Sequence, residues 1–288
     1  MNRKLLFNIL ALITVTIWGS TFVATKMLIL NGLTPTWIFI LRFLIAYLCV
    51  LIIYHKTLWS DSLRDELYLL AGGISGGSLY FIAENTALEY TFASNVSLII
   101  CTTPILTLFL SAIIYRHKIT YKSIAGSLLA LSGVAIVILN GSLNFGIKPV
   151  GDMLTLLAAL CWAVYCLLLK KLNIRYPNLF ITRKIFFYGF VTALPVAMLQ
   201  PIPHLPSQEA LPAVVGNLAF LSLFASFICY IIWNNTVKAL GPEKSANYIY
   251  FNPIITIIVS SAILSEPVTP WLLAGTVIII SGVYLCSK

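Results

Sequence analysis

The 288-residue sequence is poor in charge, because only 9% of its residues are Asp, Glu, Lys or Arg. A soluble domain carries about 25% charged residues, so this composition excludes an ordinary water-soluble fold. Nine acidic residues stand against eighteen basic ones, which gives a net charge of +9. Such an excess can indicate a nucleic-acid or acidic partner. Here the basic residues are confined to short gaps between apolar runs, so we interpret them as topology signals and predict no nucleic-acid partner.

The usual patterns of catalysis, metal binding and disulfide formation are also missing from the sequence. The histidines His55, His117 and His204 fall in predicted loops, and no HExxH, GxSxG or P-loop motif occurs. All six cysteines lie inside apolar runs without CxxC or metal-site spacing, which indicates small core residues. We therefore predict no enzyme activity, no metal site and no cofactor.

Apolar residues are abundant: 60% of the sequence is hydrophobic, and its mean hydropathy is +0.97. A helix needs about 20 mainly apolar residues to cross a membrane. Ten such runs occur, at 5–30, 35–53, 66–88, 93–115, 122–139, 150–171, 179–199, 211–236, 243–264 and 269–286. The first run resembles a signal peptide, but it is too long and many others follow, so we interpret it as a retained helix. The sequence predicts an all-α integral membrane protein with ten transmembrane helices.

The two halves of the chain are related by a repeat. Shifted by 149 positions, Pro104–Ile136 lies over Pro253–Leu285 without a gap. The matched residues are Pro104 and Pro253, Thr107 and Thr256, Thr120 and Thr269, and Ser132-Gly133-Val134 and Ser281-Gly282-Val283. We predict one five-helix repeat over residues 1–141 and another over 150–288. Because five is odd, the second repeat must be inverted in the membrane, which is typical of secondary transporters.

Basic residues in the loops predict the orientation. If the N-terminus is cytoplasmic, fifteen basic residues fall inside and only Lys148 falls outside. The loop Arg116-His117-Lys118 then faces the cytoplasm, and its counterpart Ser265-Glu266-Pro267 faces outward. We expect a multi-pass protein of the inner cell membrane with both termini in the cytoplasm.

Short motifs are spread over both repeats. They are Trp18-Gly19-Ser20, Arg42-Phe43, Ala87-Leu88-Glu89-Tyr90-Thr91, Pro104, Gly151-Asp152, Cys161-Trp162-Ala163, Trp233-Asn234-Asn235, Lys238-Ala239-Leu240-Gly241, Pro253, Glu266-Pro267 and Gly275. With them, nearly the whole chain resembles the EamA-type members of the drug/metabolite transporter superfamily. The resemblance implies a central cavity formed by the first, third, fourth, sixth, eighth and ninth helices, with the fifth and tenth at the periphery. The resemblance does not indicate the substrate. The family often has an acidic residue in the loop before the fifth helix, and this chain has His117 at that place.

Among the ionisable residues of the predicted spans, we single out three at similar depth within the membrane: Lys26, Arg42 and Glu84. Each costs at least about 2.5–3.5 kcal/mol to place in a membrane. One interpretation pairs Arg42 with Glu84 between two helices and lets Lys26 reach the surface. The other assigns Glu84 to an ammonium group or a coupling proton, and Lys26 or Arg42 to a carboxylate. Removal from water favours the protonated form of a carboxyl group, which suits proton coupling. No similar charge is found within the helices of the second half.

Helical spacing adds polar and aromatic residues to these candidates. The predicted substrate-binding residues are Trp18, Thr21, Tyr80, Glu84, Asn85, Trp162, Tyr165, Trp233, Asn247 and Tyr250. Aromatic residues in membrane helices also serve for packing, whereas a buried Asn needs hydrogen-bond partners. An aromatic cavity with few charges suits a small zwitterion better than a polyanion. We expect transport of an amino acid or similar metabolite by alternating access, and the resemblance implies that the direction is export. The alternatives are efflux of lipophilic drugs, and a membrane-embedded enzyme or assembly partner.

Pro104 and Pro253 fall in the middle of the fourth and ninth predicted helices, and each should bend its helix. They are either hinges for alternating access or fixed kinks that shape the cavity. Gly126, Gly133, Gly275 and Gly282 allow close helix approach within one chain or between two. The sequence is therefore compatible with a monomer or a homodimer.

Overall fold

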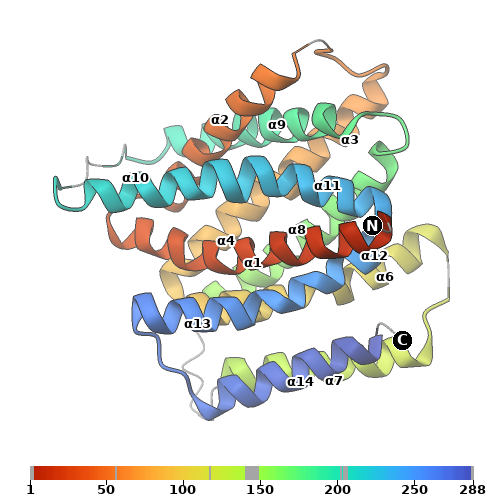
Figure 1. Cartoon of the computed structure of the whole chain (residues 1–288), viewed down its shortest axis with the longest axis vertical. Coiled ribbons are helices and arrows are strands. Elements are labelled where there is room, and N and C mark those ends of the chain that lie inside the picture. Colours follow the sequence, from red (N-terminus) through yellow and green to blue (C-terminus); the bar gives the residue numbers. More distant parts are fainter. Residues whose placement is uncertain are drawn as a thin grey trace.

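The computed structural model describes residues 3–55, 57–116, 118–139, 149–201, 203 and 207–286. Every regular element in these ranges is helical, and the helices form one bundle (Figure 1). Seven of the helices are long and apolar enough to cross a membrane. The predicted all-α membrane class is thereby confirmed. Lys56, His117, Lys148, His204 and the two chain ends lie outside the described residues.

The first half begins with two long helices joined by a turn at Gly32, whose φ of +89° favours glycine. Its elements are α1 (Arg3–Leu30), α2 (Pro35–Ile53), α3 (Leu63–Gly73), the π-helix η1 (Ile74–Ser78), α4 (Leu79–Tyr90), α5 (Ala93–Ile100), α6 (Thr103–Tyr115) and α7 (Tyr121–Leu139). No residue separates α3, η1 and α4, so they form one helical path with a π-helical turn in it.

The second half has a similar series of elements. They are α8 (Pro149–Leu172), α9 (Asn178–Met198), α10 (Leu211–Ala219), the π-helix η2 (Phe220–Ile228), α11 (Cys229–Leu240), α12 (Pro242–Ala246), the 3-10 helix η3 (Asn247–Phe251), α13 (Asn252–Leu264) and α14 (Pro270–Cys286). A shift of 149 positions carries Thr103–Tyr115 onto Asn252–Leu264, so α6 and α13 have matching bounds.

The two central prolines lie at helix starts and not in the middle of continuous helices. Pro104 occupies the first turn of α6, and Pro253 occupies the first turn of α13. Proline is well accommodated there, because its missing N–H would have no partner within the helix. The predicted spans 93–115 and 243–264 are therefore each broken and restarted, by a turn at Cys101-Thr102 and by η3.

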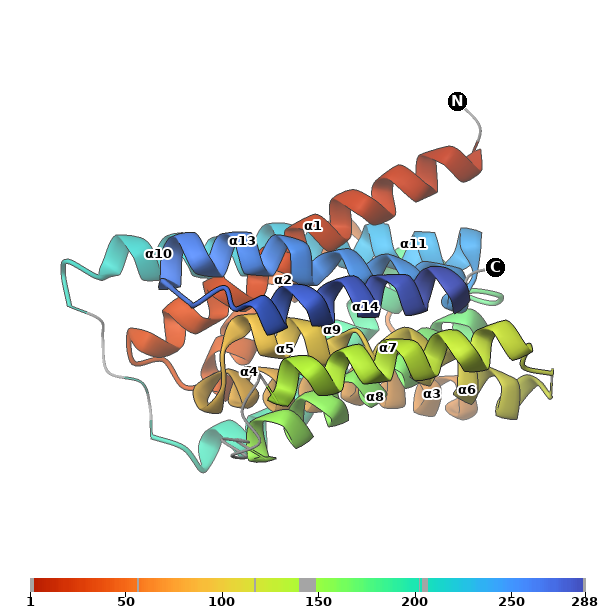
Figure 2. The ribbon, with the colours of Figure 1, turned by 90° about the horizontal axis from the view of Figure 1, so that it is seen from below.

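Helices α7 and α14 pack on each other at one edge of the bundle (Figures 1 and 2). A Cβ added at Gly133 would lie 2.8 Å from the carbonyl oxygen of Gly275, and one at Gly282 would lie 2.4 Å from the amide nitrogen of Ala130. The glycines thus permit backbone contact within one chain. These helices are the fifth and tenth predicted spans, which the resemblance places at the periphery.

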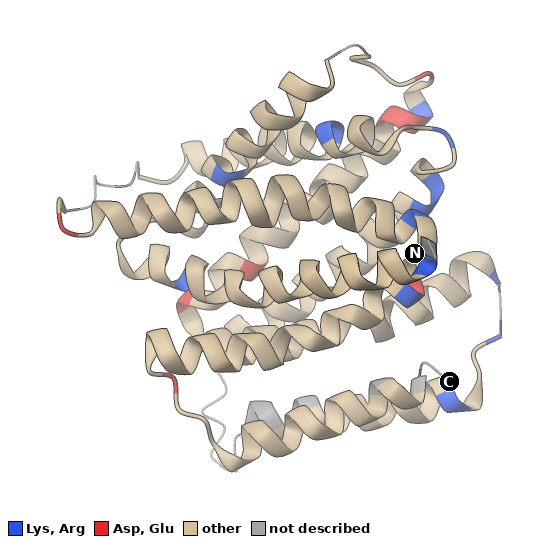
Figure 3. Ribbon diagram, viewed as in Figure 1, with Lys and Arg blue, Asp and Glu red and all other residues tan. Residues whose placement is uncertain are grey.

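Basic residues gather at the end of the bundle where α1 begins and α14 ends (Figure 3). Several of them contact carboxylates or backbone carbonyl oxygens. Lys184 pairs with Glu66, and Arg175 pairs with Asp65 at 2.9 Å. Arg183 donates to the carbonyl oxygens of the loop that follows α2. Arg183 and Lys184 lie in α9 and are 2% and 4% exposed, so the prediction that the second half holds no buried charge is wrong.

Candidate functional site

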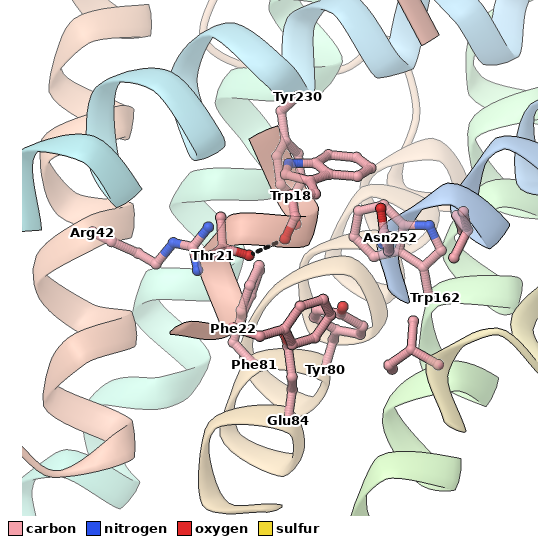
Figure 4. Close-up of a pocket in the computed structure, with 12 residues that line it drawn as sticks. Trp18, Thr21, Phe22, Arg42, Tyr80, Phe81, Glu84, Trp162, Tyr230 and Asn252 are labelled. Atoms are coloured by element: carbon pink, nitrogen blue, oxygen red, sulfur yellow. Dashed lines mark hydrogen bonds between the residues drawn. The ribbon is translucent and has the colours of Figure 1, made fainter. Parts of the chain in front are cut away.

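A cavity of about 30 Å³ lies inside the bundle, where helices of both halves meet (Figure 4). It is lined by Trp18, Thr21, Phe22, Arg42, Tyr80, Phe81, Glu84, Ile100, Trp162, Tyr230, Ile249 and Asn252. None of these residues is more than 9% exposed. Binding pockets for small molecules usually measure about 300–1,000 Å³, so the side chains fill the space that a solute would need. The structure represents a closed conformation of this cavity.

Six of the twelve residues that line the cavity are aromatic, and they come from four helices. The ring centroid of Trp162 lies 5.2 Å from that of Trp18, 5.0 Å from that of Tyr80 and 5.7 Å from that of Tyr230. The ring centroid of Trp18 also lies 5.0 Å from that of Trp233, which does not itself line the cavity. Edge-to-face and tilted pairs at such distances are favourable because ring edges carry partial positive charge and ring faces partial negative charge. The predicted Trp18, Tyr80 and Trp162 are therefore brought together.

The two π-helices provide hydrogen-bond acceptors for two of these aromatic side chains. Trp18 Nε1 donates to the carbonyl oxygen of Ala225 in η2 at 2.9 Å, and the Tyr230 hydroxyl donates to that of Gly76 in η1 at 2.6 Å. A change from α-helical to π-helical bonding leaves a carbonyl without a partner in its own helix, and such segments are frequent at functional sites. Each π-helix is thereby tied to a ring that closes the cavity.

Arg42 is held in the wall with part of its guanidinium group unused. Its Nε donates to Ser226 Oγ at 2.8 Å, and its guanidinium carbon lies 4.3 Å from the ring centroid of Phe81. Within the described part of the chain, no hydrogen bond engages its two terminal nitrogens. Because those nitrogens form a planar fork that matches a carboxylate, Arg42 can bind one in bidentate fashion.

Glu84 lines the same cavity, but it does not pair with Arg42. The interpretation that pairs them is not met, because no ion pair within 4.0 Å joins them in the described structure. Glu84 is 5% exposed, and its Oε2 has no hydrogen-bond partner among the described residues. Trp162 Nε1 and Asn252 Oδ1, two other atoms of residues that line the cavity, also have no hydrogen-bond partner among the described residues. Unpartnered buried polar atoms cost about 1–3 kcal/mol each, so the cavity offers binding groups of both kinds to water or a solute.

Other predicted site residues lie outside this cavity. Lys26 Nζ donates to the carbonyl oxygens of Leu88 and, at 3.1 Å, Thr91. Lys26, which is half-buried, therefore caps the C-terminal end of α4, where a cation is favourable. Asn85 Nδ2 donates to the carbonyl oxygen of Pro35 at 3.1 Å and fixes the start of α2. The Tyr165 hydroxyl donates to Asn234 Oδ1 at 2.7 Å, behind the cavity wall.

Asn247 and Tyr250 line a second, larger cavity of about 270 Å³, together with Pro104. The prediction assumed a continuous α-helix through this segment. Asn252, the first residue of α13, faces the central cavity instead. Helical spacing placed Asn252 on the same side of the helix as Tyr248, away from the side of Asn247 and Tyr250, and did not predict it as a site residue.

The sequence analysis also missed Phe22 and Phe81 of the central cavity, and the pairing of Lys184 with Glu66. The two phenylalanines carry no pattern that separates them from ordinary core residues. Lys184 was counted as a topology signal, and its carboxylate partner is 118 positions away in the sequence.

Comparison with known proteins places the chain in a family. The model of the EamA-like transporter family matches it twice, over residues 5–139 and 149–288. The chain belongs to the EamA-like transporter family. It is therefore a multi-pass membrane transporter, as the resemblance in its sequence predicts.

Relatives of this EamA-like transporter include an uncharacterized transporter of Archaeoglobus fulgidus, which is 28% identical and aligns over 99% of this chain and 98% of its own length. A probable amino-acid metabolite efflux pump of Salmonella typhimurium is 27% identical over 99% of this chain and 95% of its own length. A probable terminal-alkyne amino-acid exporter of Streptantibioticus cattleyicolor is 27% identical over 78% and 74%. A solved crystal structure, 15% identical, matches the fold with a TM-score of 0.67 over 97% of this chain and 95% of the other.

Proposed function

We propose that this EamA-like transporter exports an amino acid or a similar small zwitterion across the inner membrane by alternating access. The observation that carries the proposal is the placement of Arg42 and Glu84 in one buried cavity without pairing to each other. Buried charges need partners. An amino acid offers its carboxylate to Arg42 and its ammonium group to Glu84, so it can satisfy both at once.

The remaining cavity groups fit the same class of substrate. The aromatic faces of Trp18, Trp162 and Tyr230 can contact an ammonium group or an apolar side chain. Two relatives named as an amino-acid exporter and an amino-acid metabolite efflux pump support both the substrate class and the direction. A polyanion would need more cations than the one that lines the cavity.

The proposed architecture has ten membrane-crossing helices, in two inverted repeats at 1–141 and 150–288. The two matches of the family model support this division. Arg116 and Ser265, which the shift of 149 superimposes, are the non-glycine residues with positive φ in the described chain, at +53° and +54°. The gathering of basic residues at one end of the bundle supports cytoplasmic termini (Figure 3).

Transport requires the cavity to open alternately toward the two ends of the bundle. Because every lining residue is buried in the closed conformation, opening requires whole helices to move apart. The broken segments that start at Pro104 and Pro253 are the proposed hinges, since a helix break bends with fewer lost hydrogen bonds than an intact helix. Glu84 is the proposed group for a coupling proton.

The proposal is tested by counterflow into proteoliposomes loaded with unlabelled amino acids, using a labelled mixture of the twenty protein amino acids. Wild type should accumulate label above protein-free liposomes, and Arg42→Gln should not. Lys238→Gln, which removes an exposed charge at the end of α11, is the matched control and should behave as wild type. Wild-type counterflow in Arg42→Gln would contradict the assignment of Arg42.

Efflux of lipophilic cations is a second candidate, favoured by the aromatic wall beside Glu84. Such compounds need Glu84 and the rings but not a guanidinium group. Arg42→Gln should then retain resistance to lipophilic cations while Glu84→Gln loses it. Loss in both variants, together with amino-acid counterflow in wild type, favours the zwitterion.

A further inference from the structure

We propose that the larger cavity, at the basic end of the bundle, is a second substrate site that receives a zwitterion from the cytoplasm before it enters the central cavity. The inference rests on the substrate class and the orientation proposed above. The cavity lies between α6, α12, η3 and the start of α7, and its volume is about 270 Å³ against about 30 Å³ for the central cavity. It approaches the size of ordinary small-molecule pockets, which begin at about 300 Å³.

The charged residues of this cavity match both ends of an amino acid. Glu243 provides a carboxylate for the ammonium group, and Lys118 and Lys244 provide cations for the carboxylate. Glu243 is held in place by Ser111, whose hydroxyl donates to its Oε1. The hydroxyl group of Thr120 adds a further polar group. The other lining residues are the apolar Pro104, Ile105, Leu108 and Ile119, and the polar Ser123, Asn247 and Tyr250. The chemistry is that of the central cavity, in a more open setting.

The two cavities are lined by neighbouring residues of the same two broken segments. Ile100 and Ile249 line the central cavity, whereas Pro104 and Tyr250, a few residues further along the same segments, line the larger one. Between them, Cys101 Sγ lies 3.8 Å from the carbonyl oxygen of Ile249 and 3.4 Å from that of Ser97, either of which can accept its one thiol hydrogen.

This contact is a thin barrier. Cys101 and Ile249 are 1% and 2% exposed, so the contact excludes solvent. Neither break is regular α-helix, so the barrier can part with little loss of helical hydrogen bonding. A solute in the larger cavity is therefore one step from Arg42 and Glu84.

Equilibrium binding to purified full-length protein tests the inference, with the labelled mixture of the twenty amino acids as probe. Wild type should bind at both sites, and Arg42→Gln should bind at the cytoplasmic site alone. Adding Glu243→Gln and Lys244→Gln to Arg42→Gln should abolish the remaining binding. Glu243→Gln and Lys244→Gln without Arg42→Gln should leave the central site intact. Lys238→Gln is the charge-matched control, and thermal unfolding of each variant verifies its fold.

The outcomes separate this inference from the proposed function. If wild type binds only at a site that Arg42→Gln removes, the proposed function stands and the second site is refuted. If the only binding is lost in Glu243→Gln and kept in Arg42→Gln, the second site stands and the central assignment fails. No binding by wild type refutes both. If Lys118→Gln and Lys244→Gln change only the binding of phosphatidylglycerol vesicles, the cavity is a lipid site and the inference is overturned.

Discussion

The substitution Tyr230→Phe tests whether the π-helical segments hold the central cavity closed. The Tyr230 hydroxyl, on a side chain that is 1% exposed, donates to the carbonyl oxygen of Gly76 at 2.6 Å. Phenylalanine keeps the ring, and with it the packing against Trp18 at a centroid distance of 6.1 Å. The substitution therefore removes one hydrogen bond between α11 and η1 and little else.

The substitution leaves the buried carbonyl oxygen of Gly76 without a hydrogen-bond partner, and this costs about 1–3 kcal/mol of stability. This cost falls on the closed conformation, because the bond joins two elements that must separate when the cavity opens. A change of that size shifts the ratio of closed to open molecules by about 5–150-fold. The melting temperature should fall by about 2–4 °C for each kcal/mol lost.

Thermal unfolding and thiol labelling measure the two effects. The labelling rate of Cys101, which is 1% exposed, should rise in Tyr230→Phe because the open state is more populated. Tyr47→Phe is the control, since no hydrogen bond engages its hydroxyl within the described chain. If Tyr230→Phe and Tyr47→Phe have the same melting temperature and labelling rate, the argument that the bond closes the cavity is refuted.

Three further substitutions test other parts of the structure. Glu84→Gln should abolish the pH dependence of amino-acid counterflow, and a profile like that of wild type would exclude Glu84 as the coupling group. Gly282→Ala places a Cβ 2.4 Å from the Ala130 amide nitrogen, so overpacking should lower the free energy of unfolding by about 1–3 kcal/mol. The control is Gly216→Ala, whose Cβ would have no atom within 4 Å and should leave stability unchanged or raise it by about 0.5–1 kcal/mol. Thermal unfolding measures both effects. Glu266→Gln weakens the charge-assisted bonds to α5 and should destabilise the protein by at least about 1 kcal/mol, and an unchanged melting temperature would contradict that role.

The sequence predicts the helices and part of the cavity wall because both depend on regular periodicity. Apolar runs of membrane length mark the spans, and α-helical spacing brings Trp18 and Trp162 toward a common interior. The prediction fails where the helix changes type. Nothing in the residues Asn247 to Asn252 indicates a 3-10 helix, and spacing alone does not tell that Asn247 and Asn252 line two separate cavities.

Electrostatic pairing was harder to predict for a related reason. Lys26, Arg42 and Glu84 lie at similar depths along their helices, but depth does not give the direction in which a side chain points. Lys26 turns to the end of α4, and Arg42 turns to Ser226. Such choices depend on backbone acceptors and hydroxyl groups of other helices, which only the assembled fold brings within reach.

The largest difference between the repeats lies at one symmetric contact. The buried carboxylate of Glu266 accepts from the amide nitrogens of Ala93 and Ser94 at 2.8 and 3.1 Å, and from the Ser94 hydroxyl at 2.7 Å. It thereby satisfies donors that the first turn of a helix leaves unpaired, and it fixes the start of α5 to the end of α13. The end of the bundle opposite the basic residues is closed in this way.

The shift of 149 positions carries the same contact to residue 117 and the start of α12, where its chemistry is absent. Pro242 stands for Ala93 and has no N–H to donate, Glu243 stands for Ser94, and His117, which lies outside the described residues, stands for Glu266. A carboxylate at position 117 would be repelled by Glu243, and a neutral imidazole has a single acceptor nitrogen. The sequence therefore does not repeat the Glu266 carboxylate at position 117, and the larger cavity lies beside the start of α12, with Glu243 in its wall. The barrier should accordingly part first on the basic side, which is the side from which an exporter must load.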